Sequence, residues 1–139
     1  MIGILVVCHG KLAEGFYHAT SLIVGTPDNF SVIGLFEDDS IDALPKKIRE
    51  EMNKLNNGEG VLIFVDMLGA SPFNAAIKVV SQLDDANIEL ISGANLPMLL
   101  EAIMQRESDI DLKTLANLVL AAGKDQMHTL TELMSKQEK

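Results

Sequence analysis

Two side chains in this sequence have the types and positions needed for chemistry on an anionic group. His9 follows the apolar run Val6-Val7-Cys8, and Asp66 follows the apolar residues 61–65. A carboxylate that accepts a hydrogen bond from one imidazole nitrogen fixes the tautomer of the ring and leaves the other nitrogen unprotonated. It also stabilises positive charge that develops when the ring attacks. The pair therefore predicts an activated nitrogen nucleophile.

The residues beside this pair favour a bound phosphate. Gly10 and the turn at Gly69 and Ala70 let backbone approach a ligand closely. Ser71, which a proline follows, is typical of a helix N-cap. Helix starts present free N–H groups that attract anions, so we expect two of them to converge on one phosphate, with Lys11 adding positive charge.

Regular alternation of strand and helix patterns shows how the pair is positioned. Apolar runs rich in Val and Ile predict buried strands at residues 2–8, 31–36, 61–65 and 88–91. Apolar positions at helical spacing predict helices over residues 12–23, 41–55, 73–83, 96–103 and 112–122. The second helix is expected to include Ile41 in its apolar stripe and to take its cap from Asp38, Asp39 or Ser40.

This alternation predicts an α/β fold of the flavodoxin-like, doubly wound kind, with a mainly parallel sheet in the order 2-1-3-4 and helices on both faces. In that order the first and third strands are neighbours, about 4.8 Å apart, and the ligand crevice opens at their carboxyl ends. We therefore expect Asp66 to hold the His9 ring.

The residues beyond Gly123 permit two interpretations. Met127, Leu130, Leu133 and Met134 favour a helix. A short edge strand contributed to a neighbouring subunit also fits this pattern.

Composition narrows the class of protein. The 139 residues carry a formal net charge of −9, and 47% of them are hydrophobic. Length and apolar content predict one compact domain over residues 1–139, which buries roughly two-thirds of its unfolded surface. Nucleic acid is not expected as a partner, because Lys and Arg form no visible cluster.

Neither an export signal nor a cofactor site is apparent. The apolar residues 4–8 lack a basic flank and are too short for a signal peptide, and no stretch approaches bilayer length. Cys8 is the single cysteine; we expect it in the core of a protein from the reducing cytoplasm. No Cys and His cluster has zinc-ligand spacing and no P-loop is present, so neither a metal nor a cofactor is expected.

Met67 and Leu68 directly follow the acid and belong to a loop. Large apolar side chains there either fold back onto the core or form a docking surface for a partner.

Three stretches of the sequence are specific enough to suggest a family. They are Val7-Cys8-His9-Gly10, residues 65–74 with the sequence VDMLGASPFN, and residues 93–99 with the sequence GANLPML. Together they resemble the enzyme IIA component of the mannose-type (mannose/fructose/sorbose) sugar phosphotransferase system of bacteria. Cys8 stands where this family often has Thr or Ser, and Ala70 where a second Gly is common, but neither departure removes a reacting group.

The resemblance implies a phosphocarrier. His9 would accept a phosphoryl group on Nε2 from phospho-HPr and pass it to a separate enzyme IIB, while Asp66 orients the ring through Nδ1 and Ser71 lines the phosphate pocket. It also implies a cytoplasmic homodimer, in some members with an exchanged C-terminal strand, that meets the membrane only indirectly through the transporter components.

Three alternatives remain open. A phosphocarrier domain of a dihydroxyacetone kinase has the same fold, but that branch usually lacks the sequence Ser71-Pro72-Phe73-Asn74. A histidine phosphatase would want an Arg where Cys8 stands, together with a second histidine. A small-molecule binding module without covalent chemistry would use Asp66 to contact its ligand.

Overall fold

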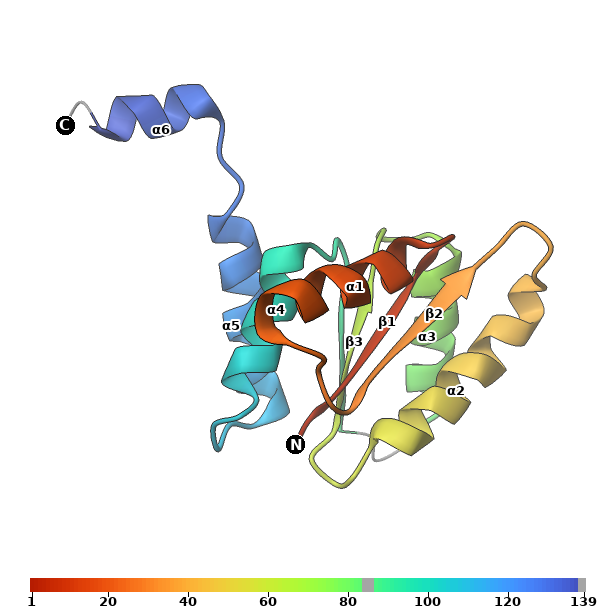
Figure 1. Ribbon diagram of the computed structural model, residues 1–139. Helices are drawn as coiled ribbons and strands as arrows, with labels where there is room; N and C mark the ends of the chain where they lie inside the picture. Colours follow the sequence, from red (N-terminus) through yellow and green to blue (C-terminus); the bar gives the residue numbers. More distant parts are fainter. Residues whose placement is uncertain (84–86, 138–139) are drawn as a thin grey trace.

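A four-stranded parallel sheet forms the centre of the computed structural model, which describes residues 1–83 and 87–137 (Figure 1). The strands are β1 Gly3–His9, β2 Phe30–Leu35, β3 Val61–Val65 and β4 Ile88–Ile91. They pair in the order β2-β1-β3-β4, and all three pairings are parallel. The predicted α/β class and strand order are confirmed.

Helices cover both faces of this sheet (Figure 1). They are α1 Leu12–Val24, α2 Leu44–Leu55, α3 Ser71–Ser81, α4 Leu96–Gln105, α5 Leu112–Asp125 and α6 Leu130–Gln137, with a short 3-10 helix η1 at Ile41–Ala43. Side chains of α1, α4 and α5 pack on one face, and those of α2 and α3 pack on the other. None of the helices within the described ranges is long and apolar enough to cross a bilayer.

Strand β1 is buried on both sides because its side chains alternate between the two cores. Ile4, Val6 and Cys8 belong to the core beneath α1, α4 and α5, whereas Leu5 and Val7 belong to the core beneath α2 and α3. Cys8 is completely buried, as predicted. The strand therefore ends at the surface with a single exposed residue, His9.

The start of α2 differs from the prediction. The Phe36 N–H donates to Asp39 Oδ2 at 2.8 Å, so Asp39 closes a turn after β2 and caps no helix. Ser40 precedes η1 but makes no capping hydrogen bond. Ile41 lies in η1 and is 57% exposed, whereas the rest of the predicted apolar stripe of α2 is buried. The expected caps and the place of Ile41 were wrong because a local side-chain turn replaces the first helical turn.

In α3 the buried stripe is shifted from the apolar positions that predict this helix. Ala75, Ala76 and Val79 are buried, whereas Ile77 and Leu83 are exposed and Leu83 lies beyond the end of the helix. Small side chains face the sheet here because α3 packs closely on β1 and β3.

The C-terminal residues form a helix, the first of the two predicted alternatives. Helix α6 extends away from the rest of the chain after the residues that follow α5 (Figure 1). Leu130, Leu133 and Met134 are exposed on it. Residues 1–83 and 87–137 therefore provide no surface that covers these apolar side chains.

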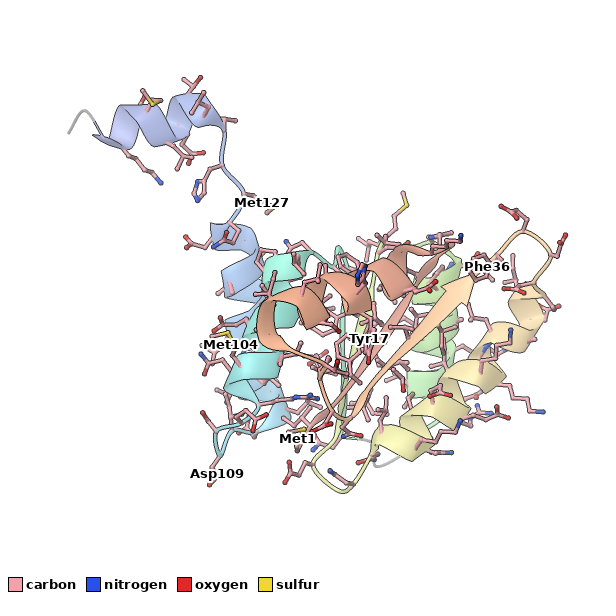
Figure 2. All side chains as sticks on the ribbon, in the orientation of Figure 1. Met1, Tyr17, Phe36, Met104, Asp109 and Met127 are labelled. Atoms are coloured by element: carbon pink, nitrogen blue, oxygen red, sulfur yellow. The ribbon has the colours of Figure 1, made fainter. Side chains whose placement is uncertain are left out.

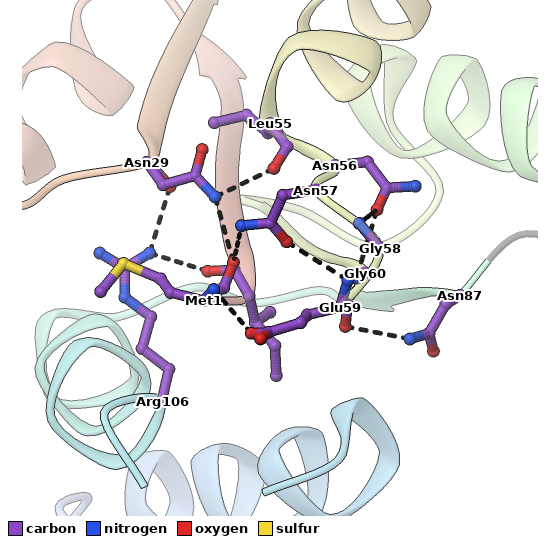
Figure 3. Close-up of polar contacts among 11 residues, drawn as sticks. Met1, Asn29, Leu55, Asn56, Asn57, Gly58, Glu59, Gly60, Asn87 and Arg106 are labelled. Atoms are coloured by element: carbon purple, nitrogen blue, oxygen red, sulfur yellow. Dashed lines mark hydrogen bonds and ion pairs between the residues drawn. The ribbon is translucent and has the colours of Figure 1, made fainter. Parts of the chain in front are cut away.

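Arg106 ties together the amino-terminal end of the sheet (Figure 3). The residue is 4% exposed, and its guanidinium donates to the carbonyls of Ile2 at 2.9 Å, of Asn29 at 3.1 Å and of Asp28. These contacts hold the edge of the sheet opposite the one where His9 lies, so they fix the scaffold without touching the predicted site.

Candidate functional site

His9 and Asp66 meet at the carboxyl edge of the sheet, as predicted. β1 and β3 are adjacent parallel strands, and Val7 is paired with Val65. The residues that follow these paired positions therefore lie side by side. The His9 side chain is 49% exposed, whereas that of Asp66 is only 12% exposed.

One oxygen of Asp66 accepts two hydrogen bonds from His9. Asp66 Oδ2 lies 2.9 Å from the His9 main-chain nitrogen and 2.8 Å from ring Nδ1. An ionised carboxylate only accepts hydrogen bonds, so Nδ1 carries the ring proton in the neutral imidazole and Nε2 has a free lone pair. The geometry thus leaves Nε2 free, as the predicted nucleophile requires, and the nucleophilic role of His9 stays a prediction.

The electrostatics of the pair keep Asp66 ionised. Burial is the largest single influence and raises the pKa of Asp66. The hydrogen bonds from the His9 N–H and ring, together with the charge of the ring, lower this pKa by more than burial raises it. The net pKa of Asp66 therefore lies below the ordinary value of 3.8. Among the described residues, Asp66 Oδ1 is buried and has no hydrogen-bond partner. Oδ2 is therefore the oxygen through which the carboxylate contacts His9.

Gly10 shapes the turn from β1 into α1. Its φ is +55°, which favours glycine, and its N–H donates to the Leu35 carbonyl at 2.8 Å. That N–H is therefore engaged by β2, so the role of Gly10 observed here is to turn the backbone. A contact between Gly10 and phosphate stays a prediction.

Gly34 is a residue of the site that sequence analysis missed. A Cβ at this position would lie 2.4 Å from the Gly10 carbonyl oxygen and 2.8 Å from the ring of Phe36. Phe36, at the end of β2 in Figure 2, is 45% exposed. A lone glycine inside an apolar strand signals such a close approach of backbone.

The start of α3 lies one residue before the predicted cap. Ala70 is the N-cap, with extended backbone, and its carbonyl accepts from the Asn74 N–H at 2.9 Å. Ser71 is the first helical residue, so the prediction that Ser71 caps α3 was wrong; the extended conformation at Ala70 makes that residue the boundary. Gly69 precedes it with φ +81°.

Two hollows lie beside residues that the sequence predicts for the phosphate site. Ser71 lines a pocket of about 190 Å³ between η1, α2 and α3, together with Asn74 and Lys78. Lys11 lines another hollow, on α1, with Glu14 and His18. The structure thus brings His9 and Asp66 together. The loop after Asp66 leads into the start of α3, whereas Lys11 lies at the start of α1.

Met67 and Leu68 do not fold back onto the core. They are 62% and 71% exposed. Of the two predicted outcomes, the structure has the exposed one, and their use as a docking surface stays a prediction. No group of three or more His, Cys, Asp or Glu side chains suited to a metal occurs in the part of the chain that the structure describes.

Comparison with known proteins identifies the family. The sequence model described as "PTS system fructose IIA component" matches residues 3–120. The chain belongs to this family. The family is the one that the three stretches around His9, Asp66 and Asn95 resemble.

Individual relatives agree with this membership. The mannose-specific EIIAB component of Escherichia coli K12 is 33% identical over 129 residues, which are 93% of this chain and 39% of that protein. The chain thus spans about two-fifths of the length of that relative. The fructose-specific EIIA component of Bacillus subtilis is 27% identical over 98% of this chain and 91% of its own.

A solved structure shows the same fold. The phosphotransferase system component EIIA from Streptococcus agalactiae has a TM-score of 0.87 and 25% identity to this chain, with coverage of 94% of this chain and 98% of the other.

Proposed function

We propose that this chain is a phosphocarrier of a bacterial sugar phosphotransferase system, which accepts a phosphoryl group from phospho-HPr on Nε2 of His9 and donates it to the cognate enzyme IIB. The observation that carries the proposal is the double hydrogen bond from His9 to Asp66 Oδ2. Membership of the IIA family supports the reaction class.

The reaction is an exchange of one phosphorus bond for another. The Nε2 lone pair of His9 attacks phosphorus while the phosphorus bond to the donor breaks, and its electron pair returns to the donor. Nδ1 keeps its proton, and the ionised Asp66 stabilises the positive charge that the phosphorylated ring acquires. In the second transfer an acceptor histidine or cysteine attacks phosphorus and the lone pair returns to Nε2.

Catalysis in this proposal is mainly positioning. Asp66 sets the direction of the ring, and the backbone at Gly69 and Ala70 together with Ser71 holds the phosphate oxygens. Gly10 supplies the turn that brings α1 toward the ring.

Both partners reach the ring directly in this proposal. The His9 side chain is half exposed, which suits direct transfer between proteins. Met67 and Leu68 form an apolar rim for a small, transient interface.

The proposal also includes a cytoplasmic homodimer that meets the membrane only through the transporter components. The exposed apolar side chains Leu130, Leu133 and Met134 of α6 support contact with a second copy. Sedimentation of the full chain and of a chain shortened after Gln126 tests the proposed dimer. The full chain should be dimeric, and the shortened chain should be monomeric.

Intact mass after incubation with enzyme I, HPr and phosphoenolpyruvate tests the carrier function. One phosphoryl group should be added to the chain. His9→Ala should abolish the addition, whereas His18→Ala and His128→Ala, the other two histidines, should retain it. An unmodified chain, or labelling that survives His9→Ala, would refute the proposal.

The same preparation separates a carrier from a histidine phosphatase. A phosphatase would turn over p-nitrophenyl phosphate without any acceptor protein. We expect no such turnover. Turnover that depends on His9 would refute the carrier function in favour of a histidine phosphatase.

A further inference from the structure

We infer that Asn74 is a positioning residue for the phosphate site, because it holds two consecutive peptide groups in the loop after Asp66 with their N–H groups available to an anion. The inference rests on the proposed function and extends it to a residue that touches neither His9 nor Asp66.

Asn74 fixes two carbonyls that follow one another in the chain. Its side-chain Nδ2 donates to the Gly69 carbonyl at 3.0 Å, and its main-chain N–H donates to the Ala70 carbonyl at 2.9 Å. Both carbonyls are therefore turned toward α3. The Ala70 bond is an ordinary first helical bond, whereas the side-chain bond reaches back over five residues into the loop.

The N–H groups of the same two peptides must point the other way. In a planar trans peptide the carbonyl and the following N–H are directed oppositely. The N–H groups of Ala70 and Ser71 therefore face away from the body of α3. The Ala70 N–H meets only the Met67 carbonyl, at a long 3.4 Å, and the Ser71 N–H finds no acceptor among residues 1–83 and 87–137. Two adjacent N–H groups of this kind form an anion-binding concavity.

This arrangement needs a restraint because Gly69 is free to rotate. Its φ of +81° is easily reached by glycine, and nothing lies within 4 Å of the place where a Cβ would be. Without the Asn74 side chain the Gly69–Ala70 peptide could flip and present a carbonyl oxygen where the phosphate must bind. That oxygen would repel the phosphate.

The test compares phosphorylation rates of three variants with that of the wild-type chain, at several concentrations of phospho-HPr. Asn74→Ala removes the side-chain donor, and the transfer step should slow about tenfold. Asn74→Asp places a carboxylate against the Gly69 carbonyl, and should slow transfer further although an acid in the first turn favours the helix. Asn57→Ala is the matched control, because Asn57 also donates to a backbone carbonyl at 3.0 Å, that of Met1, at the opposite end of the sheet.

Amide NMR gives a readout that a merely structural role would not move. On phosphorylation, the N–H resonances of Ala70 and Ser71 should shift strongly in the wild-type chain and in Asn57→Ala, and weakly in Asn74→Ala. Urea unfolding should show that Asn74→Asp is about as stable as the wild-type chain.

The outcomes distinguish failure of the proposed function from failure of the Asn74 inference. A wild-type chain that is not phosphorylated would refute the proposed function, and this inference with it. A phosphorylated wild-type chain with Asn74 variants that react at its rate would overturn the Asn74 inference alone. So would rate losses in Asn74→Ala and Asn57→Ala that simply follow their losses of stability.

Discussion

Asp66 Oδ2 accepts a hydrogen bond from the His9 main chain at 2.9 Å and another from the His9 ring at 2.8 Å. The main-chain bond fixes where the carboxylate lies, independently of the state of the ring. The ring bond then fixes the direction of the imidazole. Asp66, directly after β3, thus sets both the direction and the tautomer of the His9 ring at the end of β1.

Replacing Asp66 by Asn should slow phosphoryl transfer while the fold persists. The amide oxygen still accepts from the His9 N–H, but it lacks the negative charge that, in the proposed function, stabilises the phosphorylated ring. We expect a loss of about tenfold to a hundredfold in the rate of transfer from phospho-HPr. Rapid-quench measurements check this, with circular dichroism as the control for folding. Rates equal to those of the wild-type chain would remove Asp66 from the mechanism.

The contribution of Asp66 to stability should depend on pH. Its pKa is lower in the folded chain than the ordinary value of 3.8, so its stabilising effect is complete above that value and is lost as pH falls through the folded-state pKa. The difference in unfolding free energy between the wild-type chain and Asp66→Asn should thus be constant near neutral pH and shrink below about pH 4.

Urea titrations of both proteins across this range measure that difference. Subtraction is required because Asp111, whose pKa is also lowered by its hydrogen bonds to Thr114, contributes equally to both. A difference that grew on acidification would show that the folded-state pKa of Asp66 is raised.

Gly34→Ala should destabilise the chain and disturb the turn after His9. The added methyl group would lie 2.4 Å from the Gly10 carbonyl oxygen, which belongs to the backbone and cannot rotate away. We expect a loss of about 1–3 kcal/mol in the free energy of unfolding. Because Gly10 adjoins His9, phosphoryl transfer should slow as well.

Gly15→Ala is the matched control for that change. A Cβ at Gly15 meets nothing within 4 Å, and the residue lies inside α1. Here alanine should stabilise the chain by about 0.5–1 kcal/mol. If the two variants had the same stability, the close approach at Gly34 would not be a constraint on the fold.

Cys8 should resist alkylation in the folded chain. Burial, and then the negative charge of Asp66, raise the pKa of the Cys8 thiol to about 12, so almost no thiolate forms at neutral pH. Iodoacetamide should label the chain only after unfolding in urea. Prompt labelling of the native chain would show that β1 opens readily.

The strand order and the meeting of His9 with Asp66 could be predicted from the apolar patterns of the sequence. Val61 to Val65 form an unbroken apolar run, which is typical of a strand buried on both faces, and Asp66 follows it directly. The end of such a strand is fixed by its neighbours, so the meeting of His9 with Asp66 could be predicted from strand order alone.

Asn74, Gly34 and the turn at Asp39 could not be predicted in this way. Each acts through a bond to, or a close approach of, backbone in a loop or neighbouring strand. Such contacts depend on loop conformation and follow no periodic pattern. The glycine within the strand at Gly34 signals a close approach of backbone, but it does not say which backbone approaches. The prediction for Ile41 was wrong for the same reason. Its apolar character suggested a place in the buried stripe of the helix, which the turn at Asp39 prevents.

All six residues of β1 before His9 are buried, so the ring projects from a single edge of the sheet. In the proposed function both partners must reach the same ring nitrogen, Nε2, so they compete for one place. In the proposed function, the donor must depart before the acceptor arrives, and no ternary complex forms. Steady-state kinetics should then give parallel double-reciprocal lines, and excess unphosphorylated HPr should inhibit by competition with enzyme IIB.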